Sequence, residues 1–195
     1  MIQKKINKIV LGLSILMLLT GNGWGLRPSG GEFLDVPYKT VNGQTLAVDI
    51  YLPDTSVPSP VVIFTHGGGW SAGDKSDVRA GNISTVAQNL LDAGVAVVSV
   101  QYRLANDGSI ISNCIIDSKD AIRFITKNAT IYNIDPTRMA MFGASAGGQI
   151  AMMNAVTAND EPAFPRVLLN WRLIITSRLK DVLPGMVQSA SVKWT

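Results

Sequence analysis

The 195-residue sequence contains one cysteine and one histidine, and these two shortages limit its chemistry. A single cysteine, Cys114, excludes an intrachain disulfide and any metal site built from several cysteines. The single histidine, His66, limits the chemistry further, and we expect neither a metal nor a cofactor. Disorder throughout is also excluded, because apolar residues make up 47% of the chain and charged residues 16%. The length is that of one domain, with room for a short appendage.

The body of the chain has no excess of either charge sign. Lys+Arg 17 against Asp+Glu 14 gives a formal net charge of +3. Three of the cations, Lys4, Lys5 and Lys8, lie in the first eight residues, ahead of an uncharged apolar run. Without these three the cations number 14 and equal the 14 anions. A neutral body gives no electrostatic reason to expect a nucleic-acid partner.

The first 25 residues are typical of a secretory signal peptide. A cationic stretch ending at Lys8 precedes the apolar run IVLGLSILMLLT at residues 9–20, and GNGWG follows it. Gly23 and Gly25 supply the small residues for cleavage after Gly25. An uncleaved membrane anchor is the alternative, but the run is shorter than the roughly 20 residues that span a bilayer. We therefore expect a secreted or periplasmic protein with no stable membrane span after cleavage.

Apolar runs and amphipathic stretches alternate through the rest of the chain. An Asn42-Gly43 pair between two partly alternating strands is the strongest short signal for a hairpin. Three short apolar strands follow, each with a helix after it. The expected strands cover residues 32–38, 46–52, 61–64, 95–100 and 139–142, and the expected helices cover residues 83–93, 115–127 and 147–156. This order predicts an α/β fold in which helix-linked strands are parallel and the hairpin adds antiparallel strands at one edge.

A serine stands at the centre of GASAG, residues 143–147, which matches G-x-S-x-G. The motif directly follows the apolar strand expected over residues 139–142 and opens a helix. Small residues are needed because such a sharp strand-to-helix turn leaves no room beside the serine, whose hydroxyl is then exposed on a strained backbone. A glycine-rich turn that binds a phosphate, or nothing, is the alternative. We interpret Ser145 as a nucleophile.

Three consecutive glycines follow the strand expected over residues 61–64, in the sequence HGGGW at residues 66–70. Glycines let main-chain N–H groups turn toward a substrate without steric cover. Rigidly held N–H groups stabilise the oxyanion that forms when a hydroxyl attacks an ester carbonyl. A flexible glycine turn is the alternative, whereas the nucleotide-loop patterns G-x-G-x-x-G and G-x-x-x-x-G-K-[ST] do not occur here.

Four motifs together resemble those of the α/β-hydrolase superfamily. They are HGGGW at residues 66–70, YRL at residues 102–104, DPTR at residues 135–138 and the serine motif at residues 143–147. More narrowly, they are similar to the HGGG-bearing esterases: the hormone-sensitive-lipase-like branch and the acetyl-xylan and feruloyl esterases of bacteria. The similarity runs from about Val36 to about Val156. It implies a three-layer sandwich with a mostly parallel sheet. It also implies an esterase- or lipase-type serine hydrolase whose substrate is a small ester or an esterified polysaccharide.

The resemblance assigns roles to individual residues. Ser145 is the catalytic nucleophile, and His66 supports the oxyanion loop. Three residues donate the N–H groups of the oxyanion hole: Gly67, Gly68 and Ala146. Asp117, in the helix expected over residues 115–127, is a structural acid that we expect to pair with nearby backbone or with Arg103.

The sequence departs from the family pattern after Ser145, because no histidine follows it. A serine hydroxyl needs an adjacent base, and in this fold an acid and then a histidine follow the nucleophile along the chain. His66 belongs to the oxyanion-loop motif, so its use as the base would require a geometry that the family does not have. Residues 159–195 do not resemble the family's next strand and its acid-bearing turn.

These departures predict an incomplete domain. Residues 26–158 are expected to be the N-terminal part of an α/β-hydrolase domain that is incomplete at its C-terminus. Residues 159–195 are expected to be an unplaced tail, truncated or out of register. Activity is then impaired because the base is missing. The alternatives are a non-catalytic pseudoenzyme or binding protein, an unstable fragment, and an enzyme with a different base.

Overall fold

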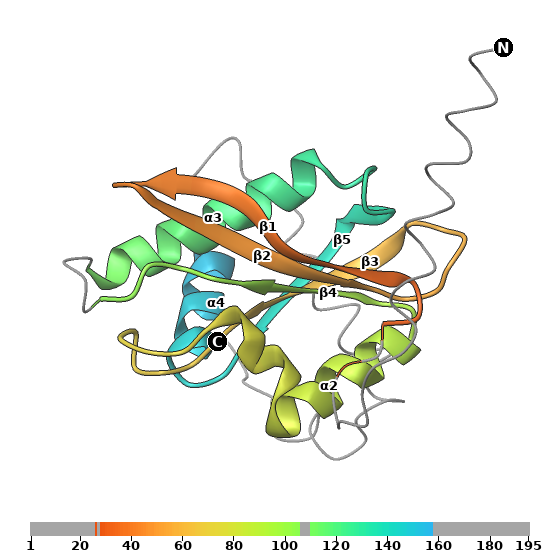
Figure 1. Cartoon of the computed structure of the whole chain (residues 1–195), viewed down its shortest axis with the longest axis horizontal. Helices are drawn as coiled ribbons and strands as arrows, with labels where there is room; N and C mark the ends of the chain where they lie inside the picture. The colour runs from red at the N-terminus through yellow and green to blue at the C-terminus, as the bar shows by residue number, and fades with distance from the viewer. Residues whose placement is uncertain (1–25, 27, 106–109, 158–195) are drawn as a thin grey trace, which may run out of the picture.

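The computed structural model describes residues 26, 28–105 and 110–157, which form one five-stranded sheet with helices (Figure 1). The strands are β1 (Gly31–Val41), β2 (Gln44–Leu52), β3 (Ser59–Thr65), β4 (Ala96–Val100) and β5 (Ile134–Gly143). The helices are the short 3-10 helix η1 (Lys75–Arg79), α2 (Gly81–Asp92), α3 (Ile111–Lys127) and α4 (Ala146–Val156). Every element expected from the sequence forms, in the expected order, and η1 is an addition to them.

The first two strands form the predicted hairpin. Val41 is in register with Gln44, so Asn42 and Gly43 make up the whole loop. Their φ angles are 51° and 78°, as in the two-residue turns whose twist matches that of the strands. β2 pairs antiparallel with β4, and the sheet order β1-β2-β4-β3-β5 places the hairpin at one edge, as predicted.

The central strand β3 determines where the two sequence motifs meet. It pairs parallel with β4 on one side and with β5 on the other. Thr65 at the end of β3 is in register with Gly143 at the end of β5. Because parallel strands end at the same edge of a sheet, HGGGW after β3 and the serine motif after β5 lie next to each other.

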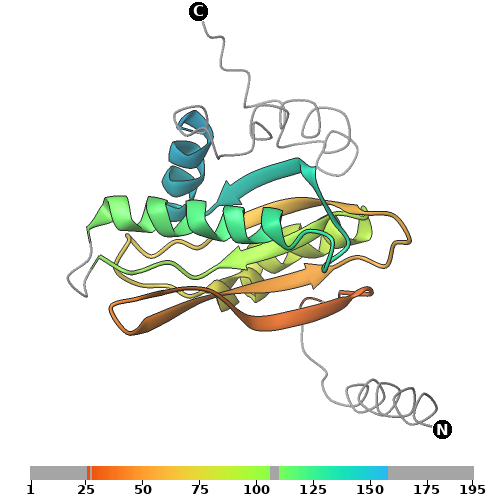
Figure 2. The same cartoon turned by 90° about the horizontal axis from the view of Figure 1, so that it is seen from above.

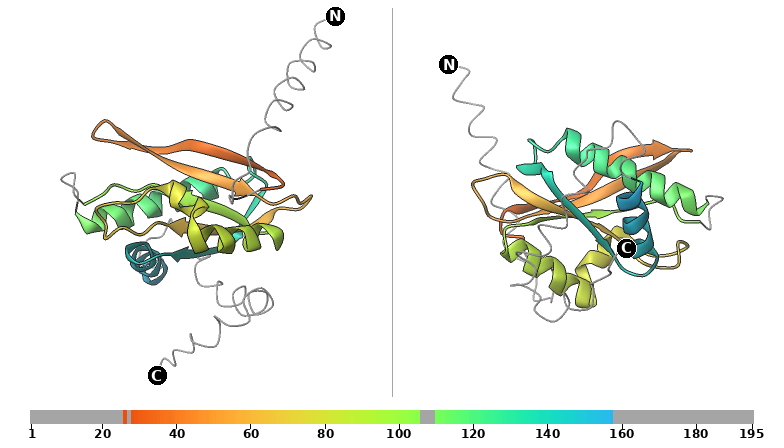
Figure 3. Two further views of the ribbon diagram at one scale, coloured as in Figure 1. Left: turned by 60° about the horizontal axis from the view of Figure 1, so that its bottom comes forward. Right: turned by 180° about the vertical axis from the view of Figure 1, so that it is seen from behind.

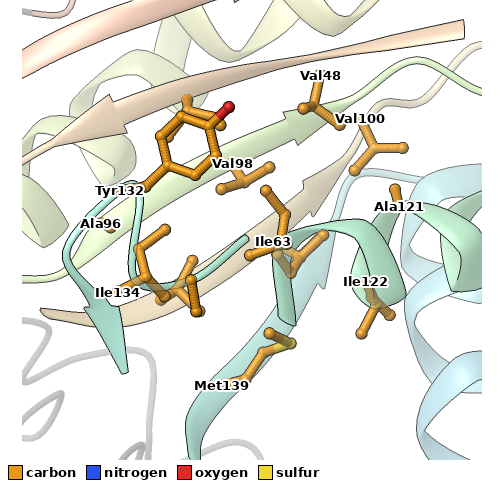
Figure 4. Close-up of a cluster of buried hydrophobic side chains, with 14 residues drawn as sticks. Val48, Ile63, Ala96, Val98, Val100, Ala121, Ile122, Tyr132, Ile134 and Met139 are labelled. Atoms are coloured by element: carbon orange, nitrogen blue, oxygen red, sulfur yellow. The ribbon is translucent and has the colours of Figure 1, made fainter. Parts of the chain in front are cut away.

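Helices cover both faces of the sheet and give the predicted three layers (Figures 2 and 3). Successive strand residues point to opposite faces. Ile63 therefore packs in the cluster that contains Ile122 of α3, as Figure 4 shows. Phe64, its neighbour in β3, packs in the cluster that contains Leu90 of α2. Helix α4 lies beside α3 and contacts β3 and β5.

The predicted signal peptide, residues 1–25, and the predicted tail, residues 159–195, lie outside the described residues. Leu26 is buried in the cluster on the α2 face of the sheet. Within the described part of the chain, no helix is both long enough and apolar enough to cross a membrane.

Candidate active site

Ser145 occupies the turn between β5 and α4, and it is exposed. Its backbone angles, φ 50° and ψ −118°, lie in a region that L-residues rarely adopt. The turn is so tight that a Cβ on Gly143 would lie 2.3 Å from the carbonyl carbon of Gly147. The predicted geometry, an exposed serine on a strained strand-to-helix turn with glycines on both sides, is therefore confirmed.

Gly147 lets the first turn of α4 rest directly on the end of β3. A Cβ at this position would lie 2.0 Å from the carbonyl oxygen of Thr65 and 2.4 Å from that of His66. The Thr65 hydroxyl also donates a hydrogen bond of 2.7 Å to the Gly147 carbonyl. The start of the helix, and Ser145 with it, is thereby fixed against the strand that leads into HGGGW.

The HGGGW loop passes beside the serine. A Cβ on Gly67 would lie 3.0 Å from the carbonyl oxygen of Ala144 and 3.5 Å from the Cβ of Ser145. Gly68 and Gly69 have φ angles of 109° and 60°, which glycine adopts readily. The fold therefore brings together the nucleophile and the oxyanion loop that the sequence predicts.

The N–H groups of the predicted oxyanion donors have no hydrogen-bond acceptor among the described residues. Within residues 28–105 and 110–157, no acceptor takes a hydrogen bond from the main-chain nitrogens of Gly67, Gly68 or Ala146. Ala146 is the first residue of α4, where N–H groups have no partner within a helix. The direction of the Ala146 N–H is nevertheless fixed. The carbonyl of Ser145, which belongs to the same peptide unit, accepts a hydrogen bond of 2.9 Å from the Gly148 N–H. Free N–H groups beside a serine can hold a negatively charged oxygen.

Comparison with known proteins assigns the family. The sequence profile of the BD-FAE family matches residues 48–177, two thirds of the chain. The chain belongs to the BD-FAE family. This domain is α/β-hydrolase-like, so the resemblance read from the motifs is confirmed. The match reaches residue 177 and thus extends beyond Val156, where that resemblance ends.

Relatives of this BD-FAE domain include esterases. The carboxylesterase NlhH of Mycobacterium tuberculosis is 41% identical over 134 residues, covering 67% of this chain and 39% of that protein. The ethyl acetate hydrolase of Pseudomonas putida is 34% identical over 140 residues, covering 68% and 42%. Among solved structures, a native esterase of Thermogutta terrifontis, Est2, has a TM-score of 0.56 at 26% identity, covering 68% and 47%. The chain thus spans less than half the length of each of these three proteins.

His66 of the BD-FAE domain is fully buried. Its Nδ1 lies 2.8 Å from the Gly67 carbonyl oxygen, and because a carbonyl can only accept, we place the ring proton on Nδ1. Burial lowers the pKa of His66, and the hydrogen bond to Gly67 offsets this only in part. Its Nε2 has no hydrogen-bond partner among the described residues, and no described side chain is hydrogen-bonded to the Ser145 hydroxyl. These contacts favour a supporting role for His66 over that of a base.

The buried imidazole should make the stability of the domain depend on pH. The pKa of His66 in the folded protein lies below the unfolded value of about 6.5. Between these two values the unfolded chain binds more protons, so the free energy of unfolding should fall as the pH drops below about 6.5. The slope is at most about 1.4 kcal/mol per pH unit. Urea unfolding from pH 5 to 8 measures it, and His66→Gln should lack this slope; equal slopes in both chains would contradict the prediction.

Asp117 is the structural acid that the sequence predicts. It is fully buried, and its carboxylate accepts hydrogen bonds from the Arg103 main-chain nitrogen (3.1 Å) and from Nε and Nη2 of Arg103 (2.7 and 2.8 Å). Lys39 of β1 donates a further hydrogen bond of 2.7 Å, which the sequence analysis did not predict. Burial alone would raise the pKa of Asp117, but the bonds from Arg103 and Lys39 hold it below its ordinary value.

The described residues contain no group of three or more His, Cys, Asp or Glu side chains that could hold a metal.

Tyr102 is the residue near the site to which the sequence analysis gave no role. It is fully buried two residues after β4, and its hydroxyl donates a hydrogen bond of 2.7 Å to the His66 carbonyl. Its ring stacks on the His66 imidazole, with 4.2 Å between the ring centroids and 9° between the planes. The only signal in the sequence was its place in the YRL motif.

Proposed function

We propose that this chain carries the nucleophile and the oxyanion-binding groups of a carboxylic-ester hydrolase. The Ser145 hydroxyl attacks the ester carbonyl, and the alcohol leaves while the acyl group stays on the serine. The N–H groups of Gly67, Gly68 and Ala146 hold the carbonyl oxygen as it becomes an oxyanion. One observation carries the proposal: an exposed, strained serine lies directly beside Gly67, and no described residue accepts a hydrogen bond from the N–H groups of Gly67, Gly68 or Ala146.

In this proposal His66 supports the oxyanion loop by fixing one peptide unit. A peptide unit is planar and trans, so its C=O and N–H point in opposite directions. The Nδ1–H of His66 holds the carbonyl of Gly67. That carbonyl shares its peptide unit with the N–H of Gly68, so the direction of the Gly68 donor is fixed by the imidazole.

We further propose that turnover by the 195-residue chain is impaired. A serine hydroxyl at neutral pH needs a base within hydrogen-bond reach. The sequence contains no histidine besides His66, whose Nδ1 is engaged by Gly67 and whose ring is buried. A non-catalytic binding protein on the same scaffold is the second candidate, and the observation that favours it is that no described side chain is hydrogen-bonded to the Ser145 hydroxyl.

For the substrate we propose a small carboxylic ester. The Pseudomonas putida relative is named for the hydrolysis of ethyl acetate, and Est2 of Thermogutta terrifontis has been solved with propionate and with butyrate bound. Trp70, at the end of the glycine loop, packs on a buried apolar cluster that includes Cys114 and Ile150. Acetyl or feruloyl groups on polysaccharides are the narrower class that the predicted secretion would suit.

The proposal predicts covalent labelling of one serine. A fluorophosphonate should modify Ser145 slowly, because the oxyanion donors are present and the base is not. Mass spectrometry of the labelled 195-residue chain locates the adduct. Ser145→Ala should abolish labelling, whereas Ser56→Ala, at another exposed serine, should leave it unchanged. An adduct on a different serine with Ser145 unmodified would overturn the assignment.

A further inference from the structure

We propose that Tyr102 is a positioning residue of the oxyanion loop, whose hydroxyl fixes the peptide unit that carries the N–H of Gly67. The importance of that N–H rests on the proposed function, but the positioning itself does not. Tyr102 does not touch the reacting atoms in this proposal. It acts through the main chain of His66.

The first step is the direction of the His66 carbonyl. This carbonyl accepts the hydrogen bond of 2.7 Å from the Tyr102 hydroxyl. It belongs to the same peptide unit as the N–H of Gly67, and the described residues contain no cis peptide bond. In a planar trans unit, a fixed C=O also fixes the opposite direction for the N–H. Tyr102 thereby does for the Gly67 donor what the imidazole of His66 does for the Gly68 donor.

The second step is that these units need such a restraint. Glycine has no Cβ to limit rotation, and Gly68 and Gly69 both have positive φ angles. The rings of His66 and Tyr102 are stacked, and each makes one hydrogen bond to a peptide unit of the loop. The Tyr102 hydroxyl holds the unit that carries the Gly67 N–H, and the His66 imidazole holds the next unit, which carries the Gly68 N–H. An N–H group that rotates away no longer stabilises the oxyanion, because this stabilisation depends on hydrogen-bond donors that are preorganised.

The third step is that Tyr102 is itself held. The N–H of Arg103, in the peptide unit that follows Tyr102, donates to the buried carboxylate of Asp117 at 3.1 Å. The Arg103 guanidinium binds the same carboxylate with two further hydrogen bonds. Burial raises the pKa of Tyr102, so its hydroxyl stays protonated and remains a donor in the neutral range. The contact with His66 is therefore made from a fixed support.

The test compares two tyrosine-to-phenylalanine variants of the 195-residue chain. Tyr102→Phe keeps the ring stack and removes only the hydroxyl. Tyr38→Phe is the matched control, because the Tyr38 hydroxyl also donates a hydrogen bond of 2.7 Å to a main-chain carbonyl, that of Gln101. That carbonyl's peptide unit carries the N–H of Tyr102 and no predicted oxyanion donor, and the control leaves the hydrogen bond from the Tyr102 hydroxyl to the His66 carbonyl in place. Urea unfolding of both variants shows whether they lose comparable stability.

The decisive measurement is the rate of fluorophosphonate labelling of Ser145 as a function of probe concentration. Tyr102→Phe should lower the maximal rate constant about tenfold, less than the roughly 10²–10³ for complete loss of a donor. The half-saturating probe concentration should stay unchanged. In Tyr38→Phe, the rate constant for labelling of Ser145 should stay within about twofold of that of the unmodified chain. Unchanged labelling of Tyr102→Phe, or an equal fall in both variants, would overturn the positioning role.

A second measurement separates this inference from the proposed function. If Ser145 of the unmodified chain is not labelled, the proposed function fails, and ¹⁵N relaxation then tests the positioning alone. In Tyr102→Phe the order parameter of the Gly67 amide should fall from the rigid value of about 0.85 toward about 0.6. The amides of Gly68 and Ala146 should keep theirs. An unchanged Gly67 order parameter would overturn the inference.

Discussion

Gly147→Ala is expected to destabilise the domain by about 3 kcal/mol or more and to abolish labelling of Ser145. The added Cβ would lie 2.0 Å from the carbonyl oxygen of Thr65 and 2.4 Å from that of His66. Both atoms belong to the main chain, so the clash is relieved only if α4 moves away from β3. Ser145 precedes α4 directly and would move with it. Urea unfolding measures the loss of stability.

The neighbouring glycine provides the control for this prediction. A Cβ on Gly148 would have its closest contact at 3.1 Å, with the Gly143 carbonyl oxygen, which a shift of a few tenths of an ångström relieves. Alanine is also preferred to glycine inside a helix by roughly 0.5–1 kcal/mol. Gly148→Ala should therefore change the stability by no more than about 1 kcal/mol. Equal losses in the two variants would contradict the argument from the contact with β3.

The order of the strands and helices could be predicted because each of them buries side chains and therefore shows a recognisable apolar pattern in the sequence. The boundaries were less accurate where the exposed ends of an element do not follow the pattern. Helix α3 begins at Ile111, four residues before the predicted start, because its first turn exposes apolar side chains such as Ile111, 45% exposed. The 3-10 helix η1 was missed because Val78 is its only buried residue.

The parts of the candidate site that could be predicted are those where the residue type indicates the conformation or the close packing of the main chain. Glycines in both motifs mark positions where main chains approach so closely that a Cβ is excluded, as at Gly147. Two supports of the site, the contacts of Lys39 and of Tyr102, were not predicted, because each joins residues far apart in the sequence. Lys39 and Asp117 are separated by 78 positions, and Tyr102 donates to a carbonyl 36 positions away. Such pairings are set by the sheet order and leave no local pattern.

The largest effect on chemistry is expected in ester hydrolysis. The 195-residue chain should hydrolyse short p-nitrophenyl esters only weakly or not detectably, far below a complete esterase. Removing members of a catalytic triad leaves roughly 10³–10⁴-fold acceleration over water, from the oxyanion hole and binding alone. Ser145→Ala should abolish any turnover that proceeds through an acyl-serine. Steady-state rates measured beside the Ser145→Ala chain as a blank give the residual activity.

The pH dependence of that residual rate distinguishes a supporting histidine from a catalytic one. His66→Ala should lower the rate, because the Gly67 carbonyl loses its partner and the Gly68 N–H is no longer held. The variant should show no change in the shape of the pH profile. Burial lowers the pKa of His66, so the ring stays neutral across the neutral range and contributes no limb there. Rapid turnover with a limb near pH 6.5, the ordinary pKa of histidine, that disappears in His66→Ala would show instead that His66 is the base.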